Sequence, residues 1–369
     1  MNKRSVVRLA EVATFSSGGT PSKADASFWK GDIPWVSPKD MKCDHLLDTE
    51  DKVTRAAVAR SAARTVGPDS VLAVVRSGIL THSFPVATLA REMSFNQDIK
   101  ALTPKSSLLL PRFLFWVLKN KEAYILQSGV KKGATVHSVA SGFLERLQFP
   151  LPSVSDQRRL IGLLNRAALI KRRANAVRAE ARSIIPTLFL STFGDPGNNP
   201  KGWPSISFEQ AVEDVTRFVP KTMKRNYLQN GAFPVYDQGQ TAIAGYTNES
   251  SQTYLAEAPL ILFGDHTRVF RLAHGRFARG ADGVRLFSPS GDFDASFLRQ
   301  YFELHGLPDA GYSRHYRFLK SISVWMPPLS LQRAFAERTG RLEGIATQLD
   351  AAAGKAEEMA AALLAEVFG

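Results

Sequence analysis

A few side chains in the first half of the chain have the types and order that metal-dependent nucleases use. Pro68-Asp69 precedes an apolar run that we expect to form a strand, and Asp98-Ile99-Lys100 follows about thirty residues later. In such a pattern two carboxylates hold Mg²⁺ and a lysine assists the attacking water. The pattern is short, and Gly283 stands where the second half of the chain would repeat Asp98. One hypothesis is therefore an Mg²⁺-dependent DNA endonuclease that uses Asp69, Asp98 and Lys100.

Other catalytic and cofactor motifs are missing from the sequence. The seven histidines show neither His-x₃-His nor His-Glu-x-x-His spacing, so no metal site is indicated. Neither a Walker loop nor Gly-x-Gly-x-x-Gly occurs, which leaves a nucleotide or methyl-donor cofactor without a phosphate cradle. Cys43 is the single cysteine, so an intrachain disulfide framework is excluded. The sequence predicts neither a metal nor a cofactor.

Basic and hydroxyl side chains gather in corresponding parts of the two halves and are typical of nucleic-acid contacts. Lysine and arginine contact phosphates, and arginine reads guanine edges with two hydrogen bonds. For any single residue a solvated surface charge is the simpler interpretation, but their recurrence in both halves favours DNA. The candidates of the first half are Thr20, Lys23, Ser37, Arg76, Ser77, Lys131, Lys132, Thr135 and His137. Those of the second half are Lys221, Lys224, Arg225, His266, Thr267, Arg268, Arg276, Arg279, Tyr312, Arg314, His315 and Arg317.

Length and charge agree with a DNA partner. The chain has 369 residues, 47 Lys and Arg against 34 Asp and Glu, and a net charge of +13, which favours a polyanion. A hydrophobic content of 44% is enough for ordinary cores. No apolar run approaches the roughly 20 residues of a membrane helix, and the basic N-terminus lacks the apolar stretch of a secretory signal. We therefore expect a cytoplasmic protein that does not act on a membrane.

An internal repeat organises the chain. Residues 144–194 match residues 319–369 without a gap at a constant offset, so that Gln157 corresponds to Gln332 and Phe193 to Phe368. The preceding segments match more loosely; Phe15, for example, corresponds to Phe218. A constant offset over about fifty residues indicates a tandem duplication of a globular lobe followed by a tail.

Both tails have the heptad spacing of long helices, with apolar residues three and four apart. The predicted seam that joins them consists of Leu160, Leu163, Ile170, Val177, Ile184 and Leu188 in the first tail and Phe335, Leu342, Ile345, Leu349, Met359 and Leu363 in the second. The alternative is that each helix only covers its own lobe. Residues 155–194 hold eight basic and two acidic residues, and residues 330–369 hold four and six, so charge also favours pairing.

The lobes themselves show mixed patterns. Ser70–Val75 and Leu260–Phe263 are typical of buried strands, and Phe113–Leu118 and Phe297–Phe302 of helices. The predicted fold class is therefore α+β, with two duplicated mixed α/β domains separated by long helices that form an antiparallel coiled coil.

Short motifs recur in order in both halves, each followed by a heptad helix. In the first half they are Gly18-Gly19-Thr20-Pro21, Ile33-Pro34-Trp35-Val36, Phe95-Asn96-Gln97-Asp98-Ile99 and Phe149-Pro150-Leu151-Pro152. In the second half they are Phe233-Pro234-Val235-Tyr236, Gly245-Tyr246-Thr247, Phe263-Gly264-Asp265-His266-Thr267, Gly280-Ala281-Asp282-Gly283 and Pro327-Pro328. With these motifs the chain resembles the specificity subunits of Type I restriction–modification systems over nearly its whole length.

The resemblance implies a DNA-recognition subunit without catalytic residues. It implies target-recognition domains at residues 1–154 and 195–329, each reading one half of a bipartite, asymmetric site in double-stranded DNA. The spacer helices, residues 155–194 and 330–369, would set the distance between the two half-sites. Methylation would belong to methyltransferase (modification) subunits, and ATP-driven cleavage to restriction/translocase subunits of the same complex.

The charge is unequal between these domains. Residues 1–154 carry 21 basic and 13 acidic side chains, whereas residues 195–329 carry 14 and 13. We expect the first lobe to supply more of the salt-dependent affinity for DNA.

Overall fold

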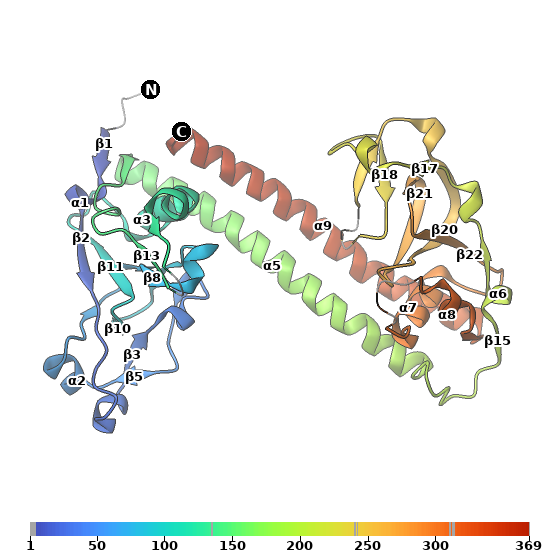
Figure 1. Cartoon of the computed structure of the whole chain (residues 1–369), viewed down its shortest axis with the longest axis horizontal. Coiled ribbons are helices and arrows are strands. Elements are labelled where there is room, and N and C mark those ends of the chain that lie inside the picture. Colours follow the sequence, from blue (N-terminus) through green and yellow to red (C-terminus); the bar gives the residue numbers. More distant parts are fainter. Residues whose placement is uncertain are drawn as a thin grey trace. The chain divides into compact units, whose positions relative to one another are not determined.

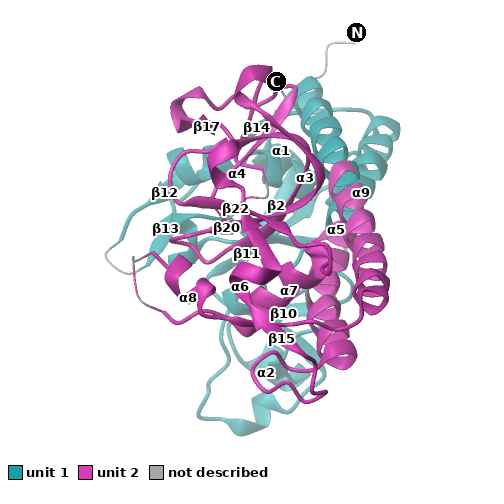
Figure 2. Cartoon of the chain, turned by 90° about the vertical axis from the view of Figure 1, so that its right-hand side faces the viewer, with its two compact units in different colours: residues 1–171, 352–369 teal, residues 172–351 magenta. Residues whose placement is uncertain are grey.

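A computed structural model describes residues 5–133, 136–239, 241, 243–309, 311 and 314–368 of the chain. It contains two compact units (Figure 2), unit 1 with residues 1–171 and 352–369 and unit 2 with residues 172–351. Each unit combines one lobe with a part of both long helices, α5 (Val154–Phe193) and α9 (Leu329–Phe368). The mixed α/β fold with long helices confirms the predicted fold class.

Unit 1 is built around a five-stranded sheet in the order β2-β11-β7-β9-β4. Its strands are β2 (Ala13–Ser17), β11 (Ile99–Pro104), β7 (Val71–Val74), β9 (Val86–Leu89) and β4 (His45–Leu46), and all adjacent pairs are antiparallel except β4 and β9. A second sheet contains β5 (Lys52–Val53), β3 (Ile33–Val36), β10 (Met93–Phe95) and β6 (Thr65–Val66). Smaller sheets pair β12 (Val130–Lys131), β13 (His137–Val139) and β8 (Arg76–Ser77), and β1 (Ser5–Arg8) with β14 (Gln148–Leu151).

Both faces of strand β7 are covered. Val71 and Ala73 pack in one apolar cluster with helix α3 (Pro111–Asn120), and Leu72 and Val74 pack in another with residues of β3 and β10. A strand that is buried on both faces needs an unbroken apolar run, as Val71–Val74 provides. The strand and the helix expected at these positions are confirmed.

Unit 2 repeats this plan with one seven-stranded sheet. Its strands are β16 (Val212–Asp214), β22 (Val284–Pro289), β20 (Tyr254–Gly264), β21 (Phe270–Gly280), β18 (Phe233–Tyr236) and β19 (Gly245–Thr247), with β17 (Lys221–Thr222) beside β21. Helix α7 (Ala295–His305) covers one face with Phe297, Leu298 and Phe302, and β15 (Ser205–Ser207) pairs with β23 (Ser323–Trp325). Shorter helices are α1 (Leu9–Val12), α2 (Arg55–Arg60) and α4 (Glu122–Tyr124) in unit 1 and α6 (Phe208–Ala211) and α8 (Tyr316–Lys320) in unit 2.

A buried glutamine joins each long helix to its lobe, in the same way in both units. Gln157 Oε1 accepts a hydrogen bond from the backbone N–H of Leu110 at 2.9 Å, and its Nε2 donates to the carbonyls of Leu108 and Pro152. Gln332 Oε1 accepts from the N–H of Asp294 at 2.9 Å, and its Nε2 donates to the carbonyls of Asp292 and Pro327.

Leu110 and Asp294 are the N-cap residues of α3 and α7. Each glutamine therefore ties the first turn of a long helix to the start of its lobe's helix. The repeat in the sequence is thus also a repeat of this connection.

The long helices run antiparallel within each unit (Figure 1). In unit 1, Lys171 of α5 forms an ion pair with Glu357 of α9, and Phe368 near the end of α9 stacks on Phe113. In unit 2, Arg178 Nε donates to Asp350 at 3.1 Å, and the ring of Phe189 lies 5.6 Å from that of Phe335. Residues late in one helix meet residues early in the other, as the coiled-coil prediction requires.

The residues of the predicted seam differ in burial. Phe335 is buried, and eight are half-buried, namely Leu160, Leu163, Ile170, Val177, Leu188, Leu342, Leu349 and Leu363. Ile184, Ile345 and Met359 are instead 39%, 49% and 54% exposed. In α5 the buried residues Leu164 and Ile185 lie one position after the predicted Leu163 and Ile184.

The physical reason is the size of the residues in the seam. Ala167, Ala174 and Ala181 are buried in α5 and Ala356 is buried in α9. Short side chains let helices approach closely, and the long aliphatic stems of lysine and arginine can lie along apolar surface while their charged ends reach an acidic partner. An apolar residue is therefore not needed at every position of this seam.

No helix in the described part of the chain has the length and hydropathy to cross a membrane.

We predict that Gln332→Met destabilises unit 2. Methionine has a similar volume but leaves the Asp294 N–H and two carbonyls without their buried partner, which costs about 3 kcal/mol. Urea unfolding followed by circular dichroism measures the loss in the free energy of unfolding. Gln348→Met, at an exposed position of the same helix, is the control and is expected to leave it unchanged. An equal effect of both substitutions would contradict the role of Gln332.

Candidate nucleic-acid interface

Three sequence motifs of unit 1 meet around the Gly18-Gly19 turn. A Cβ on Gly18 would lie 2.1 Å from the carbonyl oxygen of Phe95, so only glycine fits there. The N–H of Gly19 donates to the same carbonyl, Trp35 Nε1 donates to the carbonyl of Gly19, and Thr20 Oγ1 donates to Gln97 Oε1 at 2.6 Å. These motifs therefore build the frame of the lobe and hold Thr20 beside Gln97. Lys23 is exposed just beyond this turn.

Candidates far apart in the sequence of unit 1 come together on its three-stranded sheet. Strand β13 pairs with β8 through His137 and Ser77 and with β12 through Ser138 and Lys131. Arg76, Lys131 and Lys132 are exposed. Two hydroxyl candidates are occupied locally instead. Ser77 Oγ accepts from the N–H of Ile79, and Ser37 bonds Asp40 in a capping box. Thr135 lies outside the described residues.

The register of the main sheet is incompatible with the nuclease hypothesis. Strand β11 pairs with β7 so that Ile99 lies opposite Val74 and Leu102 opposite Val71. Asp98 is therefore at one end of β7 and Asp69 beyond the other, about 20 Å apart at ~3.3 Å per residue. Two carboxylates that bind one Mg²⁺ must both approach it to about 2 Å. Lys100 in turn forms an ion pair with Glu145 at 3.2 Å.

Unit 2 has a charged cleft of about 610 Å³ at one end of its large sheet. Both basic and acidic side chains line it. Its lining residues are Asp214, Thr216, Arg217, Lys221, Asp265, Arg279, Asp282, Gly283, Val284, Arg285 and Arg314. An adjoining hollow is lined by Asp265, Arg285, Arg314, Tyr316 and Arg317. Both are open surfaces of the kind that a backbone phosphate or a base edge could enter.

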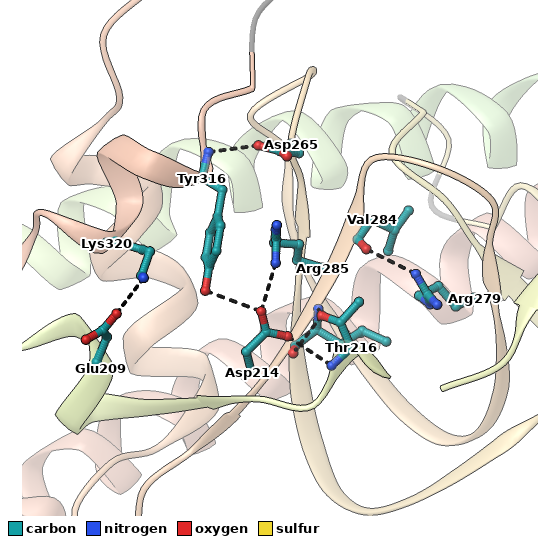
Figure 3. Close-up of polar contacts among 10 residues, drawn as sticks. Glu209, Asp214, Thr216, Asp265, Arg279, Val284, Arg285, Tyr316 and Lys320 are labelled. Atoms are coloured by element: carbon teal, nitrogen blue, oxygen red, sulfur yellow. Dashed lines mark hydrogen bonds and ion pairs between the residues drawn. The ribbon is translucent and has the colours of Figure 1, made fainter. Parts of the chain in front are cut away.

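A hydrogen-bonded cluster contributes to the lining of this cleft and of the adjoining hollow (Figure 3). Arg285 Nη1 donates to Asp214 Oδ2 at 2.9 Å, the hydroxyl of Tyr316 donates to the same oxygen at 3.3 Å, and the guanidinium of Arg285 stacks 3.7 Å from the Tyr316 ring centre. Asp265 fixes Tyr316 from the other side by accepting its N–H at 2.8 Å. The cluster comes from β16, β22, the turn after β20 and α8, so it holds the cleft together.

The electrostatics of the cluster follow from burial and pairing. Burial acts to raise the pKa of Asp214, but hydrogen bonds from Thr216 and the charge and hydrogen bond of Arg285 outweigh it, so the pKa is lowered from 3.8. Burial, and then the Asp214 carboxylate, raises the pKa of Tyr316. Asp214 is thus a carboxylate and Tyr316 a neutral donor at neutral pH.

Two candidates of unit 2 are internal, contrary to the sequence prediction. Arg279 is 7% exposed, and its Nε and Nη2 donate to the carbonyl of Val219 at 3.1 and 3.0 Å. His315 is 1% exposed, and its Nδ1 lies 3.0 Å from the carbonyl of Asp265. Both groups bond backbone carbonyls inside the lobe, and Arg279 also contributes to the lining of the cleft.

The other candidates lie at or near the surface of unit 2. Lys221, Lys224, Arg225, Arg268, Arg276, Arg314 and Arg317 are exposed, and His266 and Thr267 are half-buried. Arg268 has a positive φ of 60° and forms an ion pair with Asp309. Tyr312 lies outside the described residues.

Sequence reasoning missed Arg217, Arg285 and Tyr316. Arg285 stands in a strand pattern, where a lone charge indicates a solvated face, and no signal in one sequence pairs it with Asp214. Arg217 could have been found, because it begins the basic run that includes Lys221 and Arg225.

Residues 1–168 match the family model of the Type I restriction modification DNA specificity domain. The matched residues all lie in the first half of the chain. The turn at Gly18-Gly19 and the exposed cations on β8 and β12 lie within the matched residues.

Two curated relatives align over the same length. The specificity subunit of the Type I restriction enzyme EcoR124I/EcoR124II of Escherichia coli is 34% identical over 159 residues, 43% of this chain and 39% of that protein. The specificity subunit of the Type I restriction enzyme MjaIX of Methanocaldococcus jannaschii is 24% identical over 163 residues, 43% of this chain and 37% of that protein. The alignments thus span about two fifths of these relatives.

The fold has a solved counterpart over its full length. The crystal structure of a Type I restriction–modification system S subunit from M. genitalium has a TM-score of 0.64, with 14% identity, and covers 100% of this chain and 97% of that one. The two lobes and the long helices thus share the fold of that structure.

We predict that Asp214→Asn destabilises unit 2 at pH 7 but not in acid. Because the folded-state pKa of Asp214 is below its ordinary value, the carboxylate contributes stability above about pH 4 and loses it as pH falls through the lowered pKa. Urea unfolding of wild type and variant at pH 7 and pH 3 measures this difference in the free energy of unfolding. The exposed neighbour Glu213, changed to Gln, is the control. A destabilisation by Asp214→Asn that persists undiminished at pH 3 would contradict the assignment.

Proposed function

We propose that this chain is the DNA sequence-specificity subunit of a Type I restriction–modification complex. The observation that carries the proposal is that a lobe matching a DNA specificity domain is followed by a second lobe of the same plan, joined to its helix by the same buried glutamine. Two copies of one reader suit a site with two halves.

The two half-sites would differ in sequence. Unit 1 has exposed cations on a small sheet, whereas unit 2 has a cleft lined by a hydrogen-bonded cluster and by exposed cations. Since base contacts depend on individual side chains, such different surfaces favour an asymmetric site.

The remaining roles would belong to partner proteins. In this proposal the chain is non-catalytic and works in the cytoplasm. Methyltransferase subunits methylate the DNA, and restriction/translocase subunits cleave it. Residues 1–154 and 195–329 act as the target-recognition domains, and the helices at 155–194 and 330–369 act as spacers.

Sequencing of DNA methylation in the host tests the proposal directly. We expect that deleting the gene removes methylation at one bipartite motif and that restoring the gene returns it. A chain carrying a homologue's residues 195–329 should change one half of the motif and leave the other unchanged. A methylation pattern that is unaffected by the deletion would refute the proposed function.

The paired helices are proposed to set the distance between the half-sites. We predict that adding one heptad to both helices, after Ala174 in α5 and after Gly354 in α9, lengthens the spacer of the recognised motif. A heptad preserves the seam and adds about 10 Å of helix, or about three base pairs. Methylation sequencing measures the new spacer.

Adding the heptad to only one helix is the matched control, because it shifts one half of the seam against the other and should abolish methylation. An unchanged spacer in the double insertion would contradict the role of the helices.

A further inference from the structure

One turn of unit 2 presents an exposed aromatic ring within a basic segment. Phe218 ends a short 3₁₀ helix, Thr216–Phe218, and is 53% exposed. Residues 216–228 contain Arg217, Lys221, Lys224 and Arg225 but no Asp or Glu, in a lobe whose charges otherwise nearly balance. Met223, 47% exposed, lies in the same segment. The segment thus places two exposed apolar side chains among four cations, of which Lys221 lies 3.7 Å from Asp282.

The turn is held firmly from both sides. Val215 and Val219 are 7% and 1% exposed and belong to one apolar cluster. The N–H of Thr216 donates to Asp214 at 3.0 Å, and the carbonyl of Val219 accepts two hydrogen bonds from the buried Arg279. The turn that exposes Phe218 is thus fixed at both ends. Because its backbone is already ordered, less conformational entropy is lost when the ring binds a partner.

The sequence match of Phe15 with Phe218 is wrong in the structure. Ala13 of β2 pairs with Pro104 at the end of β11, and Val212 of β16 pairs with Pro289 at the end of β22, so Phe15 corresponds to Asp214. Phe15 pairs with Leu102 and packs on the apolar core of unit 1. Phe218 instead lies beyond the end of β16, where the chain turns outward.

The ring also lies next to the charged cleft. Arg217 and Lys221, on either side of Phe218 in the sequence, line the cleft, and the guanidinium of Arg217 lies 4.5 Å from the Phe218 ring centre. Cations near phosphates and an apolar side chain that enters a base step are the combination by which proteins kink duplex DNA.

We propose that Phe218 is a wedge that inserts between two base pairs of the half-site read by unit 2, while Arg217, Lys221 and Lys224 contact the flanking phosphates. This inference rests on the proposed function. Insertion of the ring would make binding depend on how easily one base step deforms. Flexible pyrimidine–purine steps would then be preferred at that step, even though no side chain forms a hydrogen bond to its bases. Arg279 acts as a positioning residue for the turn.

The test uses the full chain in complex with the methyltransferase subunits of its host and a duplex containing the motif found by methylation sequencing. The probe is 2-aminopurine, whose fluorescence rises when it unstacks, placed in turn at each step of the second half-site except the methylated base. We expect a rise at one step with wild type, its loss with Phe218→Ala, and its retention with Phe218→Trp. Phe218→Ala should also weaken binding about tenfold, since unstacking contacts are worth on the order of one power of ten.

Two controls separate the wedge from other effects. Leu108→Ala removes another exposed apolar side chain, 62% exposed in unit 1, and should leave fluorescence and affinity unchanged. Lys224→Ala should weaken binding and its salt dependence but keep the rise.

A rise that persists in Phe218→Ala would overturn the wedge, as would a Phe218→Ala complex that binds DNA normally but loses a protein subunit, since Phe218 would then be a protein contact. Failure of the wild-type complex to prefer the motif duplex over a scrambled one would instead refute the proposed function.

Discussion

The buried glutamine at the start of each long helix is the contact on which the arrangement of each unit depends. Gln157 and Gln332 are both fully buried, and each makes three hydrogen bonds to backbone groups, two at the start of its lobe's helix and one just before the long helix. A buried amide with all its partners fixes direction as well as distance, because losing one partner leaves another polar group without water. The long helix therefore leaves its lobe at a defined angle, and a change of surface residues in the lobe does not alter it. Because the glutamine contacts are buried, the surface residues of the two lobes can differ widely in charge while both lobes keep the same connection to their long helix.

The helix pair follows a second constraint, close approach through alanine. Ala167, Ala174 and Ala181 occupy one column of the seam, and the adjacent column includes Lys171 and Arg178, which reach Glu357 and Asp350. Exposed ion pairs contribute only about 0–1 kcal/mol each, so the apolar contacts supply most of the affinity, and the ion pairs select the antiparallel direction and register. Apolar side chains that the seam leaves exposed, such as Ile345 and Met359, lie on the outer surface of the helices.

The sequence predicted the parts of the fold that depend on local patterns. The duplication, the long helices and the buried strand and helix of each lobe follow from offset and periodicity, which are properties of one chain. Ile184, Ile345 and Met359 were assigned to the seam because their spacing fits a heptad, but a periodic pattern does not reveal that buried alanines decide which side of a helix faces its partner. Arg279 and His315 were assigned to the surface because charge type indicates exposure on average, whereas their burial depends on loop carbonyls that come from distant segments. The cluster of Asp214, Arg285 and Tyr316 is likewise made by long-range pairing.

The unequal net charge of the two lobes suggests different contributions to DNA binding. If both lobes read DNA as proposed, unit 1, with its excess of exposed cations, provides most of the sequence-independent attraction that weakens steeply with salt. The lobe of unit 2, residues 195–329, is nearly neutral, and in its cleft Asp214 pairs with Arg285 and Asp282 with Lys221. A nearly neutral lobe gains little electrostatic attraction to non-specific DNA. Its binding therefore relies on contacts that form only at the correct base step. Such a division raises the ratio of specific to non-specific binding without raising total affinity, because the discriminating lobe adds little to binding on the wrong sequence. A rigid apolar side chain such as Phe218 suits that role better than a further lysine, since its gain depends on how easily one base step opens.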